Sequence, residues 1–402
     1  MKFDVNEALT RDEALASLLG RWAMPHDEEP VAVQRACGRT LARDCCARYS
    51  LPRHRVSAFD GIAVRAVDFA DGVPDTTEWK RGVQFAQADT GDDFPDEYDS
   101  IVAAEDVSYD AEGRLVLNPD LKFKPYGGIK PAGATMREGE LLYPAGTLLD
   151  PSALAILAAG GWAEVPVLRK LRIAYIPTGT ELVPVGSEPQ RGENVQTNSV
   201  MLGALFDQWG VQMVEYAIVE DDRAKLGLAI DDALAQADIV LVNGGSSRGS
   251  EDYNSELLKE RASWFVHGVK AVPGRPIGMA IIGGKPAINV PGPMIAASLA
   301  ADWLIQGLVC AYQQRIVPPR VKVEAVLDET LTCPKPGFER LARLAAYRAD
   351  DGELHCSSIR SGASLAENIR SVNAFLAVPS GVAFEQGTKV RIEIMGTVEA
   401  AL

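Results

Sequence analysis

The chain has 402 residues and carries 55 acidic against 40 basic side chains, which gives a formal net charge of −15. A field of this sign opposes any broad polyanion-binding surface, so we expect no nucleic-acid partner, and an anionic small molecule needs a site that locally reverses the charge. Hydrophobic residues make up 47% and charged residues 24%, as in folded globular proteins, and the length predicts about two to four domains.

Residues 1–168 are predicted to form an N-terminal region with helical segments at both ends. The opening sequence MKFDVNEALTRDEALASLL favours a helix over 5–20 and lacks the basic start and apolar core of a signal peptide. Between about 30 and 135, short apolar runs alternate with turn sequences such as DGVPD and PYGGIKPAGA, which predicts an inserted β-rich module. A second helix is expected over 151–160.

From 169 to 316, apolar strands alternate with amphipathic helices. LRIAYI, VQMVEYAIV, DIVLV and PAINV are typical of strands, while QTNSVMLGALFDQWG and DDRAKLGLAIDDALAQA carry apolar residues at helical spacing. This alternation predicts a parallel sheet covered on both faces, with a last helix from about 294 to 312. Glycines, prolines, Lys285 and Asp302 interrupt the apolar segment 275–312, so we expect no membrane span.

The pair Pro318 and Pro319 marks the next boundary. RVKVEAVLD, FERLARLAAYR, ELHCSSI, AFLAVP and KVRIEIM are short alternating strands separated by turn residues, which predicts a small β-barrel over 317–402. The expected fold is therefore a multidomain α/β protein: a β-rich N-terminal module, a central parallel-sheet domain and a C-terminal barrel.

The six cysteines form no C-x-x-C pair, and the four histidines form no metal-ligand motif. We expect reduced thiols in a cytoplasmic protein, and no zinc site.

Three strands of the central domain end in glycine-bearing turns: AYIPTGTEL, LVNGGSSRG and NVPGPM. Because ligands of an open parallel sheet bind outside the carboxyl ends of its strands, we expect these turns to share one edge. Successive N–H groups of the second turn could hold an oxyanion. The pattern matches neither the dinucleotide-binding nor the Walker motif, and a strand-to-helix turn with a serine N-cap is the alternative.

Carboxylates follow the same strands, namely Glu181, Asp221, Asp222 and Asp252. Acidic groups beside an anion-binding turn suggest a hard cation, most often Mg²⁺, that bridges carboxylates and phosphate oxygens. Each has a simpler alternative: Asp221 or Asp222 could cap a helix, and Glu181 could be solvated.

Ordered motifs along nearly the whole chain resemble those of the molybdopterin molybdenumtransferases, a family that also includes the C-terminal domain of gephyrin. VQRACGRTLARD, LPRHRVSAFDGIAVRAVDF and ADTGDDFPDEYDSIVAAED are similar to its N-terminal signatures. PTGTEL, TNSVML, NGGSSRGSEDY and VPGRP resemble its central motifs, and PGFERLARL followed by SGASL resembles its barrel.

The resemblance implies a site assembled from two subunits of a homodimer, with Asp60 and Thr90 from the N-terminal module and the remaining groups from the α/β domain. From the residues alone, Asp60 and Thr90 could equally be turn residues. The implied catalytic residues are Asp60, Thr90, Glu181, Asp221 and Asp252, and the implied metal ligands are Asp60, Glu181 and Asp252. The implied substrate- and phosphate-binding residues are Gly179, Gly244, Gly245, Ser246, Ser247, Arg248, Gly249, Lys270, Arg275, Pro291, Gly292 and Ser361.

Several positions depart from the family pattern. Gly133-Ala134-Thr135 lacks the carboxylate common there, and Lys270 with Arg275 stands for two usual lysines. The remaining differences are Pro293 and Met294 in place of Asn and Pro in L-P-G-N-P, and Arg248 in place of a small apolar residue.

The resemblance implies a cytoplasmic, Mg²⁺-dependent enzyme that inserts molybdate, or tungstate, into adenylylated molybdopterin and releases AMP. Its expected partners are a molybdopterin adenylyltransferase and recipient molybdoenzymes. A divergent paralogue that binds the cofactor as carrier, sensor or scaffold is the alternative, favoured by Thr135. A third reading, adenylylation of the pterin itself, fits a shorter chain better.

Overall fold

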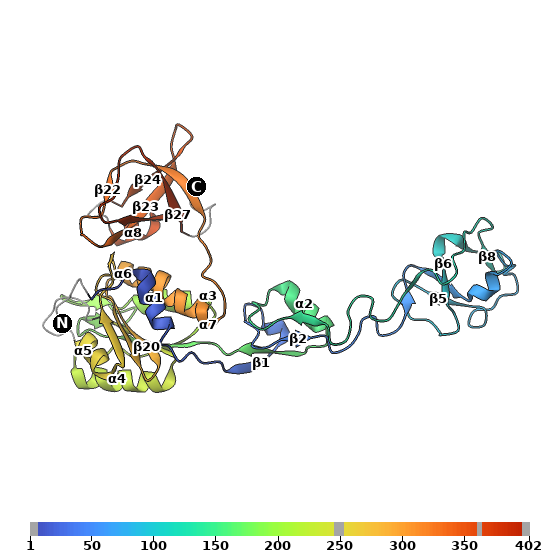
Figure 1. Ribbon diagram of the computed structural model, residues 1–402, viewed down its shortest axis with the longest axis horizontal. Helices are drawn as coiled ribbons and strands as arrows, with labels where there is room; N and C mark the ends of the chain where they lie inside the picture. The colour runs from blue at the N-terminus through green and yellow to red at the C-terminus, as the bar shows by residue number, and fades with distance from the viewer. Residues whose placement is uncertain (1–6, 245–252, 360–363, 396–402) are drawn as a thin grey trace. The chain divides into compact units, whose positions relative to one another are not determined.

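The computed structural model describes residues 7–244, 253–359 and 364–395. The chain divides into two compact units, one formed by Met1–Asp27 with Arg169–Leu402 and the other by Glu28–Leu168 (Figure 1). The first unit contains the central sheet and the barrel. The boundaries after residues 168 and 316 stay predictions.

The second unit joins a small α+β part to the β-rich module. Strand β1 (Glu28–Ala32) pairs antiparallel with β11 (Glu164–Leu168), and β2 (Cys45–Cys46) pairs with β10 (Leu141–Tyr143). Helix α2 (Pro151–Ala159) begins after Asp150, whose Oδ1 accepts from the N–H of Ala153 at 2.7 Å. Buried side chains of α2, β11 and the segment 33–45 form the core of this part.

The β-rich module predicted from the sequence is confirmed. Its central strand β4 (Gly61–Val64) lies between β5 (Phe85–Ala88) and β6 (Ser100–Ala103), both antiparallel. Close to these strands are the pairs β3 (Val56–Ser57) with β9 (Ile129–Lys130) and β7 (Val107–Tyr109) with β8 (Leu115–Leu117).

The parallel sheet of the α/β domain is also confirmed. Its strand order is β15, β12, β16, β20, β19, β17, and the first four strands are parallel. The bounds are β12 (Arg172–Pro177), β15 (Gln212–Glu215), β16 (Ile239–Asn243), β17 (Trp264–His267), β19 (Gly278–Ile282) and β20 (Lys285–Val290).

Strand β19 was not expected from the sequence, and it runs antiparallel to both neighbours. The turn from β19 to β20 uses Gly283 and Gly284 at φ of +56° and +79°, which glycine adopts without strain. Because β17 is antiparallel to β19 and β19 to β20, β17 runs in the same direction as the parallel strands. Its carboxyl end therefore reaches the same edge.

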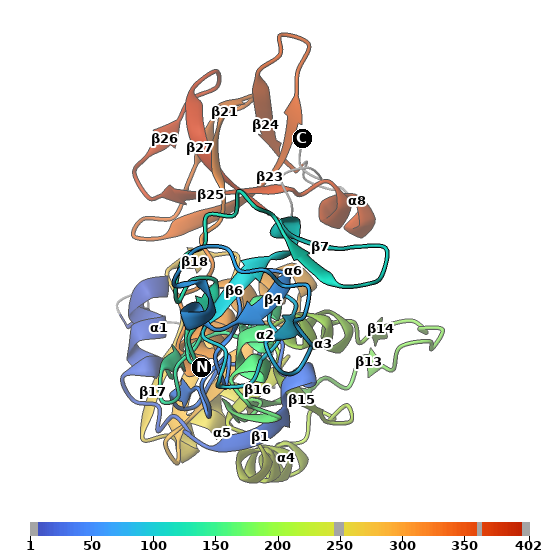
Figure 2. The same cartoon turned by 90° about the vertical axis from the view of Figure 1, so that its right-hand side faces the viewer.

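Helices cover both faces of this sheet (Figures 1 and 2). On one face α4 (Arg223–Gln236) and α5 (Tyr253–Arg261) bury Leu226, Ile230 and Leu258 against the strands. The other helices are α1 (Arg11–Leu19), α3 (Asn198–Gln208), α6 (Met294–Ala300) and α7 (Gln306–Tyr312).

Among the described residues one helical segment, Met294–Tyr312, is long and apolar enough to cross a membrane by length and composition. A π-helical turn, Ala301–Ile305, interrupts it between α6 and α7. Within the folded unit 61% of this segment is buried, as is typical of a core helix.

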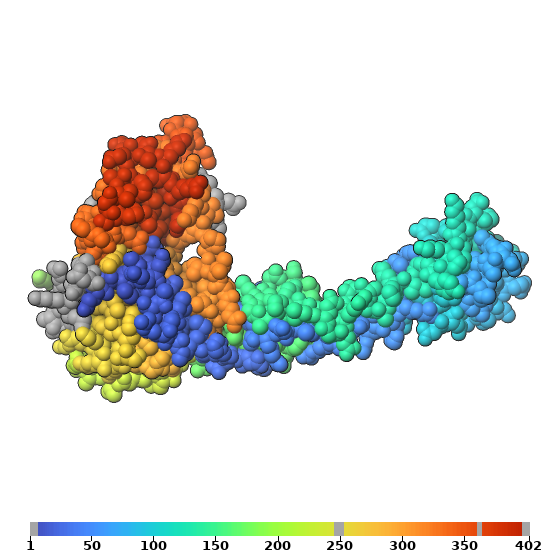
Figure 3. Space-filling model, viewed as in Figure 1, coloured from blue at the N-terminus to red at the C-terminus, as the bar shows by residue number. Residues whose placement is uncertain are grey.

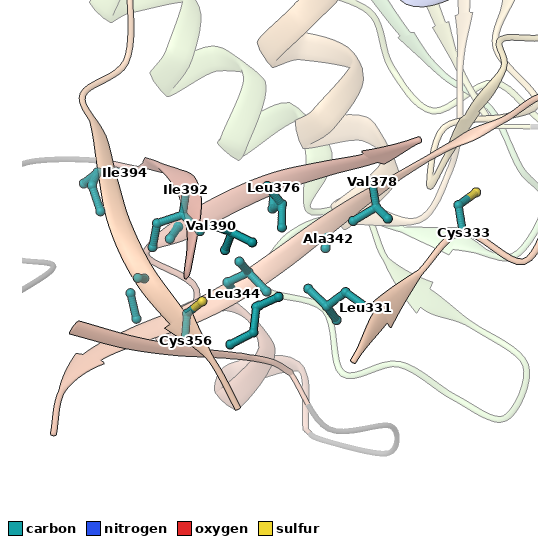
Figure 4. Close-up of a cluster of buried hydrophobic side chains, with 14 of the residues drawn as sticks. Leu331, Cys333, Ala342, Leu344, Cys356, Leu376, Val378, Val390, Ile392 and Ile394 are labelled. Atoms are coloured by element: carbon teal, nitrogen blue, oxygen red, sulfur yellow. The ribbon is translucent and has the colours of Figure 1, made fainter. Parts of the chain in front are cut away.

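The predicted C-terminal barrel is confirmed. Strands β23 (Glu339–Arg348), β24 (Leu354–Ser358), β21 (Lys322–Leu327), β27 (Lys389–Ile394) and β25 (Ala374–Pro379) follow one another, and β25 pairs back with β23 to close the sheet. Leu344, Val378 and Ile392 are among the side chains that fill the interior (Figure 4). The space-filling view shows the outer surface of the barrel domain, in orange and red, on the face turned toward the viewer (Figure 3).

Candidate functional site

The three glycine-bearing turns meet at the carboxyl edge of the central sheet. The N–H of Thr178 donates to the carbonyl of Asn243 at 2.9 Å, and the N–H of Gly244 donates to the carbonyl of Val290 at 3.2 Å. These bonds continue the β12–β16–β20 ladder beyond the strands. They place Gly179, Gly244 and Gly292 on neighbouring turns.

Gly244 is required where the turns approach most closely. A Cβ on this residue would lie 2.2 Å from the carbonyl oxygen of Thr178, and its φ is +138°. A Cβ on Gly292 would lie 3.9 Å from the Cα of Gly244. Only glycine at 244 allows the first two turns to touch.

Asp221 reaches the first turn from the segment that follows β15. Its Oδ2 accepts from the backbone N–H of Thr180 at 3.1 Å, and its own N–H donates to the Thr180 hydroxyl at 3.2 Å. The Thr178 hydroxyl donates to Oδ1 at 3.5 Å. Asp222, by contrast, is the N-cap of α4 and accepts from the N–H of Lys225 at 2.8 Å. Asp221 thus fixes the turn, whereas Asp222 has the capping role.

Glu181 is exposed at the same edge. Its carboxylate lies against Gly179, since a Cβ there would be 2.6 Å from Oε2. No donor within the described ranges hydrogen-bonds to this carboxylate. Its two oxygens are therefore available to a ligand or to solvent.

A pocket of about 760 Å³ opens beside the first turn. Its walls combine apolar side chains, including Leu182, Val200 and Ile218, with the acidic groups Glu215 and Glu220. No lysine or arginine of the described chain lines it. Such a pocket suits a flat heterocycle with N–H donors better than a phosphate group.

Lys270 and Arg275 follow β17 at the same edge. The N–H of Val269 donates to the carbonyl of Arg275 at 3.0 Å, and the N–H of Lys270 donates to the carbonyl of Leu9 at 2.7 Å. The pKa of Glu13 is lowered first by the Thr10 N–H and hydroxyl, with a smaller electrostatic contribution from Lys270. Lys270 therefore lies within electrostatic range of α1.

A second pocket, of about 320 Å³, lies where β18 (Ala271–Val272) pairs with barrel strand β23. Lys335, Arg340 and Arg343 line it together with Ser358. Burial lowers the pKa of Arg343. None of these four residues was predicted from the sequence to belong to a site. Arg340 and Arg343 belong to the segment FERLARL, which the sequence connected only with the barrel.

Four buried polar side chains lie beneath the turns and were also not expected: Tyr175, Gln196, Asn198 and Asn243. One sequence feature could have indicated Asn243, because this polar residue ends the apolar strand IVLVN directly before two glycines. A polar group there needs partners, because buried polar groups are hydrogen-bonded.

Asp60 and Thr90 belong to the other compact unit, where the structure brings them together. Both residues are exposed, and Oδ1 of Asp60 accepts from the N–H and the hydroxyl of Thr90. Thr135, the residue without the usual carboxylate, donates its N–H to the carbonyl of Leu51 at 2.9 Å in the same unit.

The remaining predicted site residues lie outside the described residues: Gly245, Ser246, Ser247, Arg248, Gly249, Asp252 and Ser361. In the described ranges no group of three or more His, Cys, Asp or Glu side chains could hold a metal ion. Of the expected Mg²⁺ ligands, Glu181 lies at the sheet edge and Asp60 belongs to the other compact unit, while Asp252 is outside the described residues.

Two family models match the chain. One is described as the MoeA N-terminal region (domain I and II) and matches residues 5–161, and the other, described as a probable molybdopterin binding domain, matches residues 174–310.

Similar proteins can be aligned with most of the chain. A molybdopterin molybdenumtransferase from Nostoc sp. is 31% identical, over 73% of this chain and 71% of the relative. One from Haemophilus influenzae is 27% identical, over 83% and 85%. Two crystal structures of molybdopterin biosynthesis MoeA proteins from Pyrococcus horikoshii align with TM-scores of 0.78 and 0.69, at 22% and 24% identity, over 96% of this chain and 99% and 100% of theirs. This last likeness concerns the fold.

Proposed function

The chain belongs to the molybdopterin molybdenumtransferase family of molybdenum cofactor biosynthesis, and we propose that it inserts molybdate into adenylylated molybdopterin with release of AMP. Water would cleave the phosphoanhydride bond that joins the pterin phosphate to AMP. Molybdate would form two Mo–S bonds with the dithiolene sulfurs of the pterin, and the two thiol protons would leave with one oxide of molybdate as water, without any change of oxidation state.

The observation that carries the proposal is the meeting of Gly179, Gly244 and Gly292 with Asp221 at one sheet edge. Backbone N–H groups of close turns bind phosphate oxygens, and the adjoining pocket of about 760 Å³ has the apolar walls and acidic groups that suit a heterocycle. The anhydride would lie along the turns and a ring of the substrate in this pocket. The protein then contributes positioning and electrostatic stabilisation.

Molybdate is a tetrahedral dianion, so its site must be locally positive in a chain of net charge −15. The barrel pocket lined by Lys335, Arg340 and Arg343 has this character, and the Ser358 hydroxyl adds a donor. We assign the oxyanion to this pocket, with tungstate as the alternative of the same shape and charge.

The proposal includes a requirement for Mg²⁺, supported by the carboxylates that follow the strands, Glu181 among them. Loss of AMP release in EDTA and recovery with added Mg²⁺ is the expected result. Full activity in EDTA would contradict the metal requirement and leave the transfer reaction in place.

The proposal also includes a cytoplasmic homodimer that receives its substrate from a molybdopterin adenylyltransferase and delivers the product to molybdoenzymes. Sedimentation equilibrium tests the dimer, and a concentration-independent monomer would contradict it. Mixing experiments with the two partner enzymes test the hand-over.

The deciding experiment incubates the purified protein with adenylylated molybdopterin, Mg²⁺ and molybdate, and follows AMP and cofactor together. Molybdate-dependent release of AMP with formation of active cofactor is expected. Tight binding of the pterin without AMP above background would overturn the enzyme proposal and support the carrier, sensor or scaffold alternative that Thr135 favours.

A matched pair of arginines on β23 tests the oxyanion pocket. Arg340→Ala is expected to raise the molybdate concentration needed for half-maximal activity by at least about tenfold, because a charged partner is lost. Arg348→Ala is the control, since this exposed arginine at the end of β23 donates to the carbonyl of Gly352 at 2.9 Å and does not line the pocket. An equal response of both variants would contradict the assignment.

A further inference from the structure

A chain of buried hydrogen bonds runs from the start of helix α3 across strands β12 and β16 to the turn after β20. Gln196 Oε1 accepts from the N–H of Ser199 at 3.3 Å and from its hydroxyl at 3.0 Å. Gln196 Nε2 donates to the Tyr175 hydroxyl at 3.1 Å, which donates to Asn243 Oδ1 at 2.7 Å. Asn243 Nδ2 then donates to the carbonyl of Pro291 at 2.9 Å.

The direction of every bond in this chain is determined by its ends. A backbone N–H can only donate, so Oε1 of Gln196 faces Ser199 and its Nε2 must donate to Tyr175. The Tyr175 hydroxyl accepts that bond and gives its own hydrogen to Asn243, and burial raises the pKa of Tyr175, so it stays a donor. Carbonyl oxygens, which can only accept, fix the amide of Asn243 at the other end.

Asn243 uses its full hydrogen-bonding capacity. Its Oδ1 accepts from Tyr175 and, at 2.9 Å, from Asn198 Nδ2, while its Nδ2 donates to the carbonyls of Pro291 and, at 3.2 Å, Val290. Its side chain is 3% exposed. A side chain that is satisfied in this way has one orientation, and any change to it leaves buried partners unpaired.

The turn that Asn243 holds is poor in donors of its own. Pro291 and Pro293 carry no N–H, and Asn198 Nδ2 supplies a bond of 2.8 Å to the carbonyl of Gly292. Asn198 and Asn243 therefore hydrogen-bond to the backbone carbonyl groups of this turn. The N–H of Gly292 is the one donor left between the prolines, and no acceptor in the described chain takes it, while the residue is exposed.

We propose that Asn243 is a positioning residue that holds the Pro291–Pro293 turn against Gly244, so that the free N–H of Gly292 faces an anionic oxygen of the ligand. The ligand class is a phosphoanhydride or phosphate monoester, and this assignment rests on the proposed function. Asn243 acts through the turn and does not touch the substrate.

The effect on binding follows from the geometry. Without the donors of Asn243, the carbonyl of Pro291 loses its hydrogen-bond partner and must turn to find another, while the carbonyl of Val290 keeps only the N–H of Gly244. The Gly292 N–H would then move with the Pro291 carbonyl. Anion binding at this edge should therefore weaken, although the sheet beneath the turn stays folded.

Asn243→Asp is the main test, because it keeps the shape of the side chain but replaces both donors by acceptors. Asn373→Asp in the barrel is the matched control, since Asn373 also holds a backbone segment, accepting from the N–H and donating to the carbonyl of Ala346, each at 2.7 Å. Both variants should lose thermal stability, so stability alone does not decide between a positioning and a structural role.

Three measurements on the folded full chain decide between a positioning and a structural role of Asn243. Relative to wild type, Asn243→Asp is expected to raise the Kd for AMP and for inorganic pyrophosphate about tenfold. It should raise KM by a similar factor, with a smaller change in kcat. Amide hydrogen exchange in residues 286–296 should become faster. Asn373→Asp should leave all three unchanged. Wild-type Kd, KM and exchange in folded Asn243→Asp would overturn the proposal.

Two further experiments distinguish failure of the proposed function from failure of the Asn243→Asp variant to fold. If the wild-type protein binds pyrophosphate but releases no AMP, the proposed function fails, while exchange and pyrophosphate binding still decide the role of Asn243. If Asn243→Asp does not fold, Tyr175→Phe removes one donor to Asn243 without adding charge. It should weaken AMP binding in the same direction, and wild-type binding in this variant would overturn the proposal.

Discussion

Oδ1 of Asp60 accepts two hydrogen bonds from Thr90, one from the backbone N–H and one from the hydroxyl, each 2.7 Å long. The residues meet because β4 and β5 pair antiparallel, with Gly61 opposite Ala88. Both bonds favour the ionised carboxylate and lower the pKa of Asp60, the backbone bond more than the hydroxyl. Their stabilising effect is present above the unfolded pKa and is lost as the pH falls through the lower folded pKa.

Thr90→Val removes the hydroxyl donor and keeps the N–H. The pKa of Asp60 should rise but stay below its ordinary value of about 3.9, as measured by NMR titration of the carboxyl carbon. Thr77→Val is the control, because Thr77 donates in the same way to Asp75 at 3.0 and 2.8 Å, and it should leave Asp60 unaffected. We expect Thr90→Val alone to lower turnover, because the family resemblance places Thr90 in the site. Equal turnover of both variants would exclude that role.

Gly244→Ala should disrupt the meeting of the turns, because the new methyl group would lie 2.2 Å from the carbonyl oxygen of Thr178. We expect a loss of about 3 kcal/mol in the free energy of unfolding, measured in urea, together with loss of AMP binding. Gly203→Ala in α3 is the control, since its Cβ would meet only the Met213 sulfur at 3.5 Å. That variant should bind AMP normally, and normal binding by Gly244→Ala would contradict the close approach.

The ion pair between Arg169 and Asp238 should stabilise the central domain strongly. Two bonds of 2.8 and 2.7 Å join the side chains, whose exposed fractions are 19% and 10%, and Asp238 also accepts from the N–H of Arg172 at 2.9 Å. Burial acts to raise the pKa of Asp238, but the bonds from Arg169 and Arg172 together prevail and lower it. Its contribution is therefore present at neutral pH and is lost on acidification.

Asp238→Asn should cost about 3 kcal/mol in urea unfolding at pH 7, because it leaves the charge of Arg169 with one exposed carboxylate partner, Asp27. Asp231→Asn breaks the more exposed pair with Arg261 and should cost less than about 1 kcal/mol. A similar small cost for both would show that the buried pair is not stabilising.

His355 in the barrel lies between two carboxylates, with Nδ1 2.8 Å from Asp328 and Nε2 3.1 Å from Asp351. Hydrogen bonds to Asp328 and then Asp351 raise the pKa of His355 above its ordinary value. A raised folded pKa stabilises fully below the unfolded value of about 6.5, and this stabilisation disappears as the pH rises through the folded pKa.

His355→Gln should therefore lower the Tm more at pH 6 than at pH 9. His26→Gln is the control, since His26 forms no ion pair within the described part of the chain. A Tm difference for His355→Gln that does not change with pH would contradict the ion-pair origin of the effect.

The elements of the fold could be predicted because their signals are local. The continuous apolar run of β12 and the helical spacing of Leu226, Ile230 and Ala233 in α4 lie within short windows, and each element was found. Strand β19 was not predicted, and its direction could not be, since a short apolar strand has no sequence feature that separates parallel from antiparallel pairing. Closure of the barrel by β23 and β25 depends likewise on pairing between distant segments.

The sequence by itself determined which residues could form the site: the glycines of the turns, the acidic groups after the strands, and the family to which the chain belongs. Only the tertiary structure decided how they are held. Asn243 finds Tyr175 68 residues away in the chain and Pro291 48 residues away, and these pairings exist because β12, β16 and β20 are neighbours in one sheet. Hydrogen-bond partners across a sheet are set by strand order and register, and neither is a local property of the chain.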